Sequence, residues 1–150
     1  MRFIDSNVLA YAFYENENRE KCQEIIKNGG IINTINLIEA YNIIQFEVNA
    51  DYAAKSIRSL LKSNLSIISV DINLIFQALK RASKHTKLKF IDIVHYTTSL
   101  LYNCQEIASY DSDFDNLVFK SLLHNLKISK SLFCFKTYFI SKTHNLFYSF

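Results

Sequence analysis

Four acidic side chains stand at the ends of predicted strands or on the first turns of predicted helices: Asp5, Glu39, Asp92 and Asp111. Asp5 and Asp111 each follow a short apolar segment that we predict to be a strand, and Asp92 opens an apolar-periodic helix pattern. Open α/β sheets carry their chemistry at the carboxyl ends of the strands. If the strands are parallel, Asp5 and Asp111 share one edge of the sheet, and the helix of Asp92 packs back beside them.

Carboxylates gathered at one place raise one another's pKa values unless a cation binds among them. Hard oxygen ligands suit Mg²⁺ or Mn²⁺. One or two such ions can hold a phosphodiester, lower the pKa of a bound water and stabilise the leaving oxygen of an in-line displacement. This chemistry needs no serine, histidine or cysteine nucleophile. The four acids therefore predict a metal-dependent phosphodiesterase site.

Each of these residues also has a simpler interpretation. Asp5 and Asp92 could only cap the helices that follow them, because aspartate is a leading N-cap residue. Glu39 could be an ordinary exposed helix acid, and Asp113 could be a turn residue. His95 follows Asp92 by about one helical turn and could be a base or a ligand, although a packed or surface histidine is the favoured interpretation.

The elements that must position these acids alternate along the chain. Apolar segments predict strands at residues 2–4, 31–32, 65–70 and 107–108. Capping residues and helical periodicity predict helices at residues 8–13, 17–27, 51–62, 71–84 and 92–103. A further long helix is expected after Asn33 and Thr34, which would cap it. Gly29 is expected to end the second of these helices in a left-handed conformation. This alternation predicts an α/β fold with a central parallel sheet flanked by helices.

The composition of the chain excludes several classes of protein and several kinds of binding site. A chain of 150 residues with 49% hydrophobic residues predicts one globular domain. No apolar run reaches membrane-spanning length and no apolar leader segment precedes Asp5, so we expect a cytoplasmic protein. The two glycines, Gly29 and Gly30, are too few for a phosphate-binding loop or a dinucleotide fingerprint. Three cysteines without metal-ligand spacing predict reduced thiols.

The last part of the sequence, residues 120–150, differs from the rest. It has five lysines and no acid, whereas residues 1–119 hold all 14 acids and carry a net charge of about −2. Weak patterns suggest a helix at 122–128 and short strands at 132–140. Its lysines and aromatic rings could bind single-stranded RNA by charge and stacking, or pack on the body or on another subunit. We therefore divide the chain into a domain at 1–119 and an atypical extension at 120–150.

Four segments, taken together and in order, resemble a known family. They are F-I-D-S-N-V-L at residues 3–9, Glu39 in a helix after a short strand, F-I-D-I-V-H-Y at 90–96, and S-Y-D-S-D-F at 109–114. This combination resembles the PIN domain, and most closely the VapC-type toxin ribonucleases of VapBC toxin–antitoxin pairs. The resemblance covers residues 1–119 and implies a three-layer α/β/α fold with a central parallel sheet.

The resemblance also implies a function. It implies Mg²⁺- or Mn²⁺-dependent cleavage of single-stranded RNA and, for a toxin, homodimerisation and inhibition by a small antitoxin. The catalytic and metal-binding acids would be Asp5, Glu39, Asp92 and Asp111, with Ser6, Ser109 and Asp113 as auxiliary positions. Ser109 stands where the family more usually has threonine. Members usually finish with a short strand soon after the last acidic segment, which residues 116–119 would supply, and residues 120–150 depart from that ending.

Two other functions remain open at this stage. The chain could be a PIN nuclease of RNA maturation or decay, with no antitoxin. It could also be a non-catalytic PIN-like scaffold that binds RNA or protein, which the unusual extension would suit, although the four intact acids argue against lost catalysis. Basic residues near the predicted site could hold RNA phosphates or form a solvated helix end: Arg81, Lys84, Lys87 and Lys89.

Overall fold

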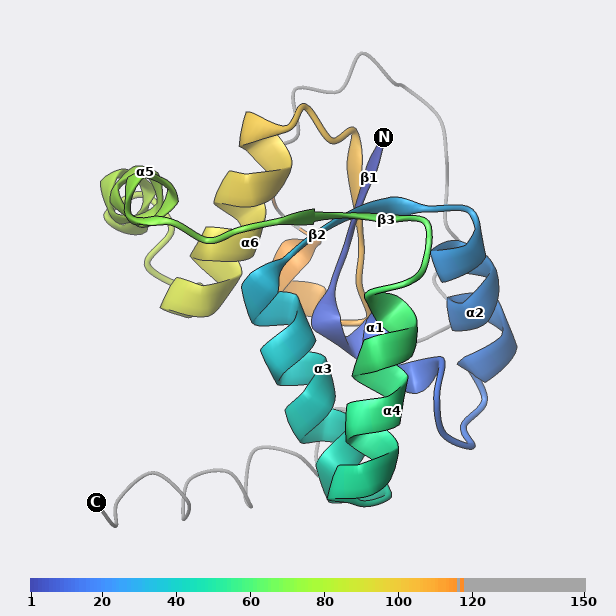
Figure 1. The fold of residues 1–150 in the computed structure, drawn as a ribbon. Helices are drawn as coiled ribbons and strands as arrows, with labels where there is room; N and C mark the ends of the chain where they lie inside the picture. Colours follow the sequence, from blue (N-terminus) through green and yellow to red (C-terminus); the bar gives the residue numbers. More distant parts are fainter. Residues whose placement is uncertain (116, 118–150) are drawn as a thin grey trace, which may run out of the picture.

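In the computed structural model, which describes residues 1–115 and 117, a parallel sheet lies at the centre of the chain (Figure 1). The strands in these residues are β1 (Arg2–Ile4), β2 (Gly30–Asn33), β3 (Leu65–Ile68) and β4 (Glu106–Ala108). Their order is β3-β2-β1-β4, and each neighbouring pair is parallel. The central parallel sheet predicted from the sequence is therefore confirmed.

Helices follow the strands in sequence and form the remaining layers. Over the same residues they are α1 (Ser6–Tyr11), α2 (Arg19–Lys27), α3 (Thr34–Glu47), α4 (Ala50–Leu60), α5 (Ile72–Ala82) and α6 (Phe90–Leu101), with a short 3₁₀ helix η1 (Ser112–Phe114). None of these helices combines the length and apolar character that a membrane crossing requires.

Alternate side chains of the strands pack in different hydrophobic cores, one on each face of the sheet. Ile4 and Ile32 pack with α1, α2, α3 and α4 in one hydrophobic core. Phe3 and Ile31 pack on the other face, where the ring of Phe3 lies 5.7 Å from the ring of His95 in α6. Successive residues of a strand point to opposite faces, so the sheet lies between two helical layers. Figure 1 shows α5 outside α6 on the second side, and the fold is a three-layer α/β/α arrangement.

Several element boundaries differ from those predicted. Strand β3 ends at Ile68 rather than Val70, because the Val70 N–H donates to the Thr34 hydroxyl at 3.1 Å instead of extending the ladder. Helix α6 begins at Phe90, so Asp92 lies inside the first turn and Lys89 takes the N-cap position. The interpretation of Asp92 as an N-cap is therefore wrong. Gly29 adopts the predicted left-handed conformation, with φ of 77°.

Other sequence predictions fall partly or wholly outside the described residues. They are the final strand at 116–119, the helix at 122–128, the strands at 132–140 and the thiol of Cys134. The division into 1–119 and 120–150 likewise stays a prediction. Within the described part, Cys22 and Cys104 are buried free thiols, as predicted.

Two adjacent threonines in α6 allow a matched test of how much a hydrogen-bond partner matters to a buried hydroxyl group. Both are fully buried. The Thr97 hydroxyl has no hydrogen-bond partner among residues 1–115 and 117, whereas the Thr98 hydroxyl accepts from Asn33 Nδ2 at 3.0 Å and donates to the Val94 carbonyl at 2.8 Å. We expect Thr97→Val to stabilise the protein by about 1 kcal/mol and Thr98→Val to destabilise it by about 1–3 kcal/mol. Urea unfolding of both variants measures this, and equal effects of the two would contradict the hydrogen-bond assignment.

Candidate functional site

Asp5 lies at the junction of β1 and α1 and is almost completely buried. It is the N-cap of α1, and its Oδ1 accepts a hydrogen bond from the Ser6 N–H at 2.7 Å. Its Oδ2 accepts from the Asn7 amide at 2.9 Å and from the Ser109 hydroxyl at 2.6 Å. The helix-capping interpretation of Asp5 is therefore correct, and the same carboxylate is also tied to the end of β4.

Ser109 and Asp111 follow β4, directly beside Asp5. The Asp111 N–H donates to the Ser109 hydroxyl at 2.9 Å, so Ser109 connects Asp5 and Asp111 through one oxygen. The Asp111 carboxylate accepts from the Asp113 N–H at 2.9 Å and caps η1. The Asp113 side chain is exposed, and its backbone forms the turn that holds Asp111. Parallel pairing of β1 and β4 thus brings two predicted acids to one edge of the sheet.

Glu39 reaches the same edge from α3. Its Oε2 accepts hydrogen bonds from the Ser6 hydroxyl at 2.6 Å and from His95 Nε2 at 2.7 Å. Since Ser6 follows Asp5, this contact connects Glu39 to the first acid. Burial alone would raise the pKa of Glu39, but the hydrogen bonds from His95 and Ser6 hold it below its ordinary value. Glu39 is therefore no ordinary exposed helix acid.

Asp92 completes the group from the first turn of α6. Its side chain is half-buried and accepts no hydrogen bond from any residue that the structure describes. Burial, with added repulsion from the charges of Asp5 and Asp111, raises the pKa of Asp92 to about 6. Burial likewise raises the pKa of Asp5 above its ordinary value. The structure thus brings all four predicted acids together, and we call Asp5, Glu39, Asp92 and Asp111 the acidic cluster.

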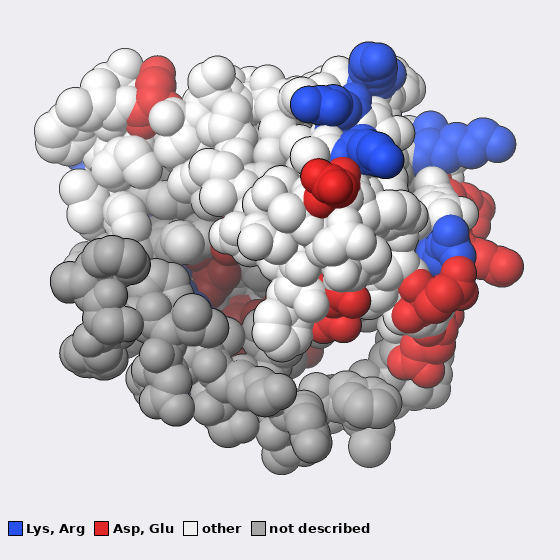
Figure 2. Space-filling model, turned by 60° about the horizontal axis from the view of Figure 1, so that its bottom comes forward, with Lys and Arg blue, Asp and Glu red and all other residues white. Residues whose placement is uncertain are grey.

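The C-terminal edge of the sheet is turned toward the viewer in Figure 2, where acidic side chains are visible set back from the described surface. As these side chains stand, no three Asp, Glu, His or Cys residues among 1–115 and 117 form a group that could hold a metal ion. Of the predicted basic residues, Lys89 contributes to the electrostatics of the cluster, because its charge lowers the pKa values of Glu39 and Asp92.

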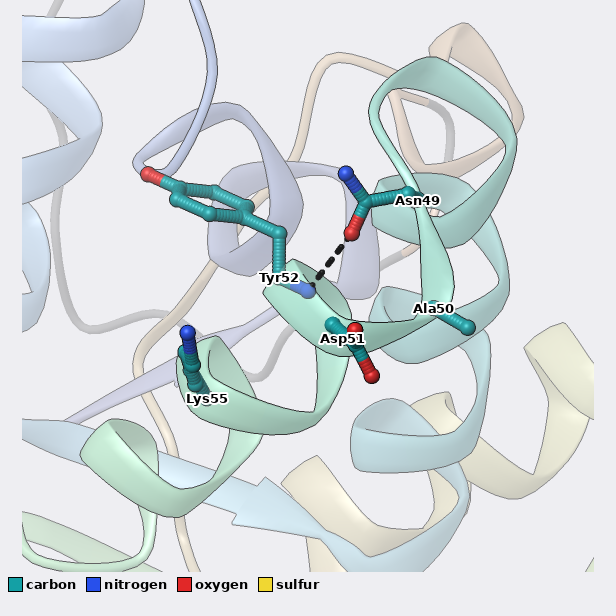
Figure 3. A pocket seen from close by; sticks show the side chains of 5 residues that line it. All are labelled: Asn49, Ala50, Asp51, Tyr52 and Lys55. Carbon is teal, nitrogen blue, oxygen red and sulfur yellow. Dashed lines mark hydrogen bonds between the residues drawn. The ribbon is translucent and has the colours of Figure 1, made fainter.

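Two surface hollows lie away from the acidic cluster. One, of about 430 Å³, opens at the start of α4 (Figure 3) and is lined by Asn49, Ala50, Asp51, Tyr52 and Lys55. There Asn49 caps the helix by accepting from the Tyr52 N–H at 2.8 Å. The other, of about 360 Å³, is lined by residues around the start of α2. Neither hollow includes an acid of the cluster, so the acidic cluster at the sheet edge is itself the candidate site.

Sequence reasoning missed a set of buried polar residues behind Glu39. Asn33, Asn36 and His95 are all almost inaccessible to solvent. Asn33 was expected only to cap α3, which it does, together with Asn36 in a reciprocal capping box. His95 is a packed histidine, and it also bonds an acid of the cluster. The sequence feature that could have indicated these buried residues is the pair Asn33 and Asn36, three residues apart where an apolar strand ends and a helix begins.

Comparisons with known proteins agree with this geometry. A solved structure of Mycobacterium tuberculosis VapC20, described as a sarcin–ricin loop cleaving toxin, superposes with a TM-score of 0.68 over 77% of this chain and 93% of that one. At 15% identity this likeness shows the fold. No curated protein matches the sequence. The family model of the PIN domain matches residues 2–120, which includes every acid of the cluster. This chain belongs to the PIN domain family.

Proposed function

We propose that this chain is a metal-dependent endoribonuclease that cleaves single-stranded RNA and acts as the toxin of a toxin–antitoxin pair. The observation that carries the proposal is the convergence of four carboxylates, from four different parts of the chain, at one edge of the sheet of a PIN domain. RNA as the substrate is supported by the toxin whose fold this chain shares, which is described as a sarcin–ricin loop cleaving toxin.

The chemistry of the acidic cluster fits a divalent cation. All its donor atoms are carboxylate oxygens, which Mg²⁺ and Mn²⁺ prefer. Burial raises the pKa values of Asp5 and Asp92 above their ordinary values, and a bound cation would favour the ionised forms of both carboxylates. Asp5, Glu39, Asp92 and Asp111 would hold the ion. When bound, it would supply charge stabilisation of the phosphodiester and would lower the pKa of a bound water.

The residues of this chain contribute orientation and charge. Ser6 and Ser109 hold Glu39 and Asp5 by hydrogen bonds of 2.6 Å each. Asp92, with a pKa raised to about 6, is ionised at neutral pH and is free of hydrogen bonds from the described residues, so it can accept a proton from an attacking water. Lys89 is exposed beside Glu39 and Asp92, and it can bind an RNA phosphate by charge.

Cleavage of defined RNAs tests this function. We expect the purified protein to cut a single-stranded RNA with Mg²⁺ or Mn²⁺, to cut a fully paired RNA much more slowly, and to cut neither with a chelator. Absence of cleavage by folded protein with either metal would favour the non-catalytic scaffold. Equal cleavage with and without chelator would contradict the metal-dependent chemistry.

The toxin role has its own test, because a nuclease of RNA maturation or decay would pass the cleavage assay too. We expect induced expression of the chain to arrest growth, and Asp5→Asn to relieve the arrest at equal protein level. A small protein encoded next to this gene that binds the chain and restores growth would support a toxin in the cytoplasm. Cleavage without growth arrest would favour the housekeeping alternative.

Homodimerisation is supported by an apolar stripe on α5. Ile72, Phe76 and Leu79 are 70%, 55% and 52% exposed, and their spacing places them along one side of the helix. Exposed apolar patches of this kind mark association surfaces. We expect the chain to be a dimer by light scattering and Phe76→Glu to make it a monomer. Asn73→Glu, a charge added at an exposed polar position of α5, should leave the dimer intact, and equal behaviour of the two variants would contradict this interface.

A further inference from the structure

A buried chain of polar side chains lies behind Glu39, on the side away from solvent. Its members come from the start of α3 and from α6: Asn33, Asn36, His95 and Thr98. Each is at most 1% exposed. Buried polar atoms are costly without partners, so the hydrogen bonds among them fix which atom donates and which accepts.

The orientation of the Asn33 amide is set by its capping role. Its Oδ1 accepts from the N–H groups of Ile35 and Asn36, at 3.0 and 3.2 Å. Its Nδ2 therefore faces α6, where it lies 3.0 Å from His95 Nδ1 and 3.0 Å from the Thr98 hydroxyl. An amide nitrogen only donates. His95 Nδ1 must accept, and the ring proton must lie on Nε2.

The Asn36 amide is fixed in the same way. Its Oδ1 accepts from the Asn33 N–H at 2.8 Å, so its Nδ2 donates to the Ser6 hydroxyl at 3.0 Å. Ser6 has one hydroxyl proton, which it donates to Glu39 Oε2. Asn36 Nδ2 also lies 3.4 Å from His95 Nε2, and because both are donors, each must point to another acceptor.

Both donors converge on a single oxygen of Glu39. His95 Nε2 and the Ser6 hydroxyl bond Oε2, while Oε1 accepts no hydrogen bond from the part of the chain that the structure describes. Two bonds to one oxygen restrict rotation of the carboxylate and leave the other oxygen available. Such outer contacts orient metal-binding carboxylates, and their loss typically weakens metal affinity by about 10–100-fold.

We propose that His95 is a positioning residue, which Asn33 holds as the Nε2–H tautomer so that it fixes Glu39 with Oε1 available to a divalent cation. The proposal rests on the proposed function, because it takes the acidic cluster to be a metal site. It assigns His95 no contact with RNA or with the ion.

Nuclear magnetic resonance tests the tautomer without any activity measurement. In a long-range ¹H–¹⁵N spectrum of the metal-free protein, we expect His95 to show a protonated Nε2 and an unprotonated Nδ1, and His95→Gln identifies its signals by their loss. A protonated Nδ1 would overturn the proposal.

Mn²⁺ affinity, measured by titration calorimetry, tests the positioning role. His95→Leu removes the donor and should weaken Mn²⁺ binding by roughly tenfold or more. His95→Gln offers an amide donor at a similar reach and should restore most of that loss. Thr98→Val is the matched control: it also disturbs the buried chain, but it touches Asn33 rather than Glu39, so it should lower stability and leave Mn²⁺ affinity within about twofold.

The outcomes separate this inference from the proposed function. If wild-type protein binds Mn²⁺ and cleaves RNA while His95→Leu binds Mn²⁺ equally well, the positioning role is wrong and the nuclease stands. Failure of His95→Gln to improve on His95→Leu would also overturn it. If wild-type protein binds Mn²⁺ and shows this pattern of variants but cleaves no RNA, the positioning role stands and the nuclease fails.

Discussion

Asp92→Asn is expected to abolish RNA cleavage and, at the same time, to raise the melting temperature of the metal-free protein at pH 7.5. The half-buried Asp92 carboxylate accepts no hydrogen bond within the described part of the chain and lies near the charges of Asp5 and Asp111. Asparagine has nearly the same shape and no charge. It removes the repulsion and also removes the group that would bind the ion and accept a proton.

The sign and pH range of the stability effect follow from the pKa of Asp92. The folded protein raises this pKa from 3.8 to about 6, so it binds the proton more tightly than the unfolded chain does. The contribution of Asp92 to stability is fully present below pH 3.8 and is lost as the pH rises through about 6. The advantage of Asp92→Asn should therefore grow between these pH values and level off above them.

Thermal melts with chelator at pH 4 and pH 7.5 measure this effect. After allowance for solvent screening at a partly exposed site, we expect a gain of about 1 kcal/mol, or about 2–4 °C, at pH 7.5 and a much smaller gain at pH 4. Asp51→Asn is the control, because this exposed acid at the start of α4 lies outside the acidic cluster and should affect neither stability nor cleavage. A lower melting temperature of Asp92→Asn at pH 7.5 would show that the carboxylate has a stabilising partner instead.

Asn33→Ala should have the largest effect on stability. The Asn33 side chain is fully buried, caps α3 through two N–H groups and donates to His95 and Thr98. Alanine removes the cap, which is worth about 1 kcal/mol, and leaves buried polar atoms unpaired at about 1–3 kcal/mol each. We expect a total loss of about 3–5 kcal/mol, a large part of the stability of an ordinary domain.

Urea unfolding followed by circular dichroism measures this loss. Asn33→Asp separates the two roles, because aspartate keeps the acceptor for the cap of α3 and loses the donor toward His95 and Thr98. Its stability should fall between those of the wild type and Asn33→Ala. A loss below about 1 kcal/mol for Asn33→Ala would mean that the buried chain of polar side chains contributes little.

The features of the fold that depend on residues close together in the chain could be predicted from the sequence. The order of strands and helices, the left-handed Gly29 and the cap at Asn33 all follow from residues close together in the chain. Asp5 and Asp111 met as predicted, because parallel strands bring their carboxyl ends to one edge. Asp92 lies in the first turn of its helix as predicted, although α6 begins at Phe90, two residues before the predicted start.

The remaining features depend on contacts that no local pattern contains. Strand β3 stops early because Val70 finds a partner in Thr34, 36 residues away in sequence. His95 and Asn33 are 62 residues apart, and both belong to residue types that are more often exposed or only partly buried. Only the packing of α6 against β2 and α3 makes them a buried pair, so a sequence in isolation shows them as an unremarkable cap and an ambiguous histidine.

Mn²⁺ binding to single variants of the acidic cluster tests the central claim most directly. Asp5→Asn, Glu39→Gln, Asp92→Asn and Asp111→Asn would be titrated with Mn²⁺ beside the wild type and the control Asp51→Asn. We expect each of the four cluster variants that remains folded to bind Mn²⁺ at least roughly tenfold more weakly, and Asp51→Asn to bind like the wild type. Equal affinity in all six proteins, or no binding to the folded wild type, would contradict a metal site built by these four acids.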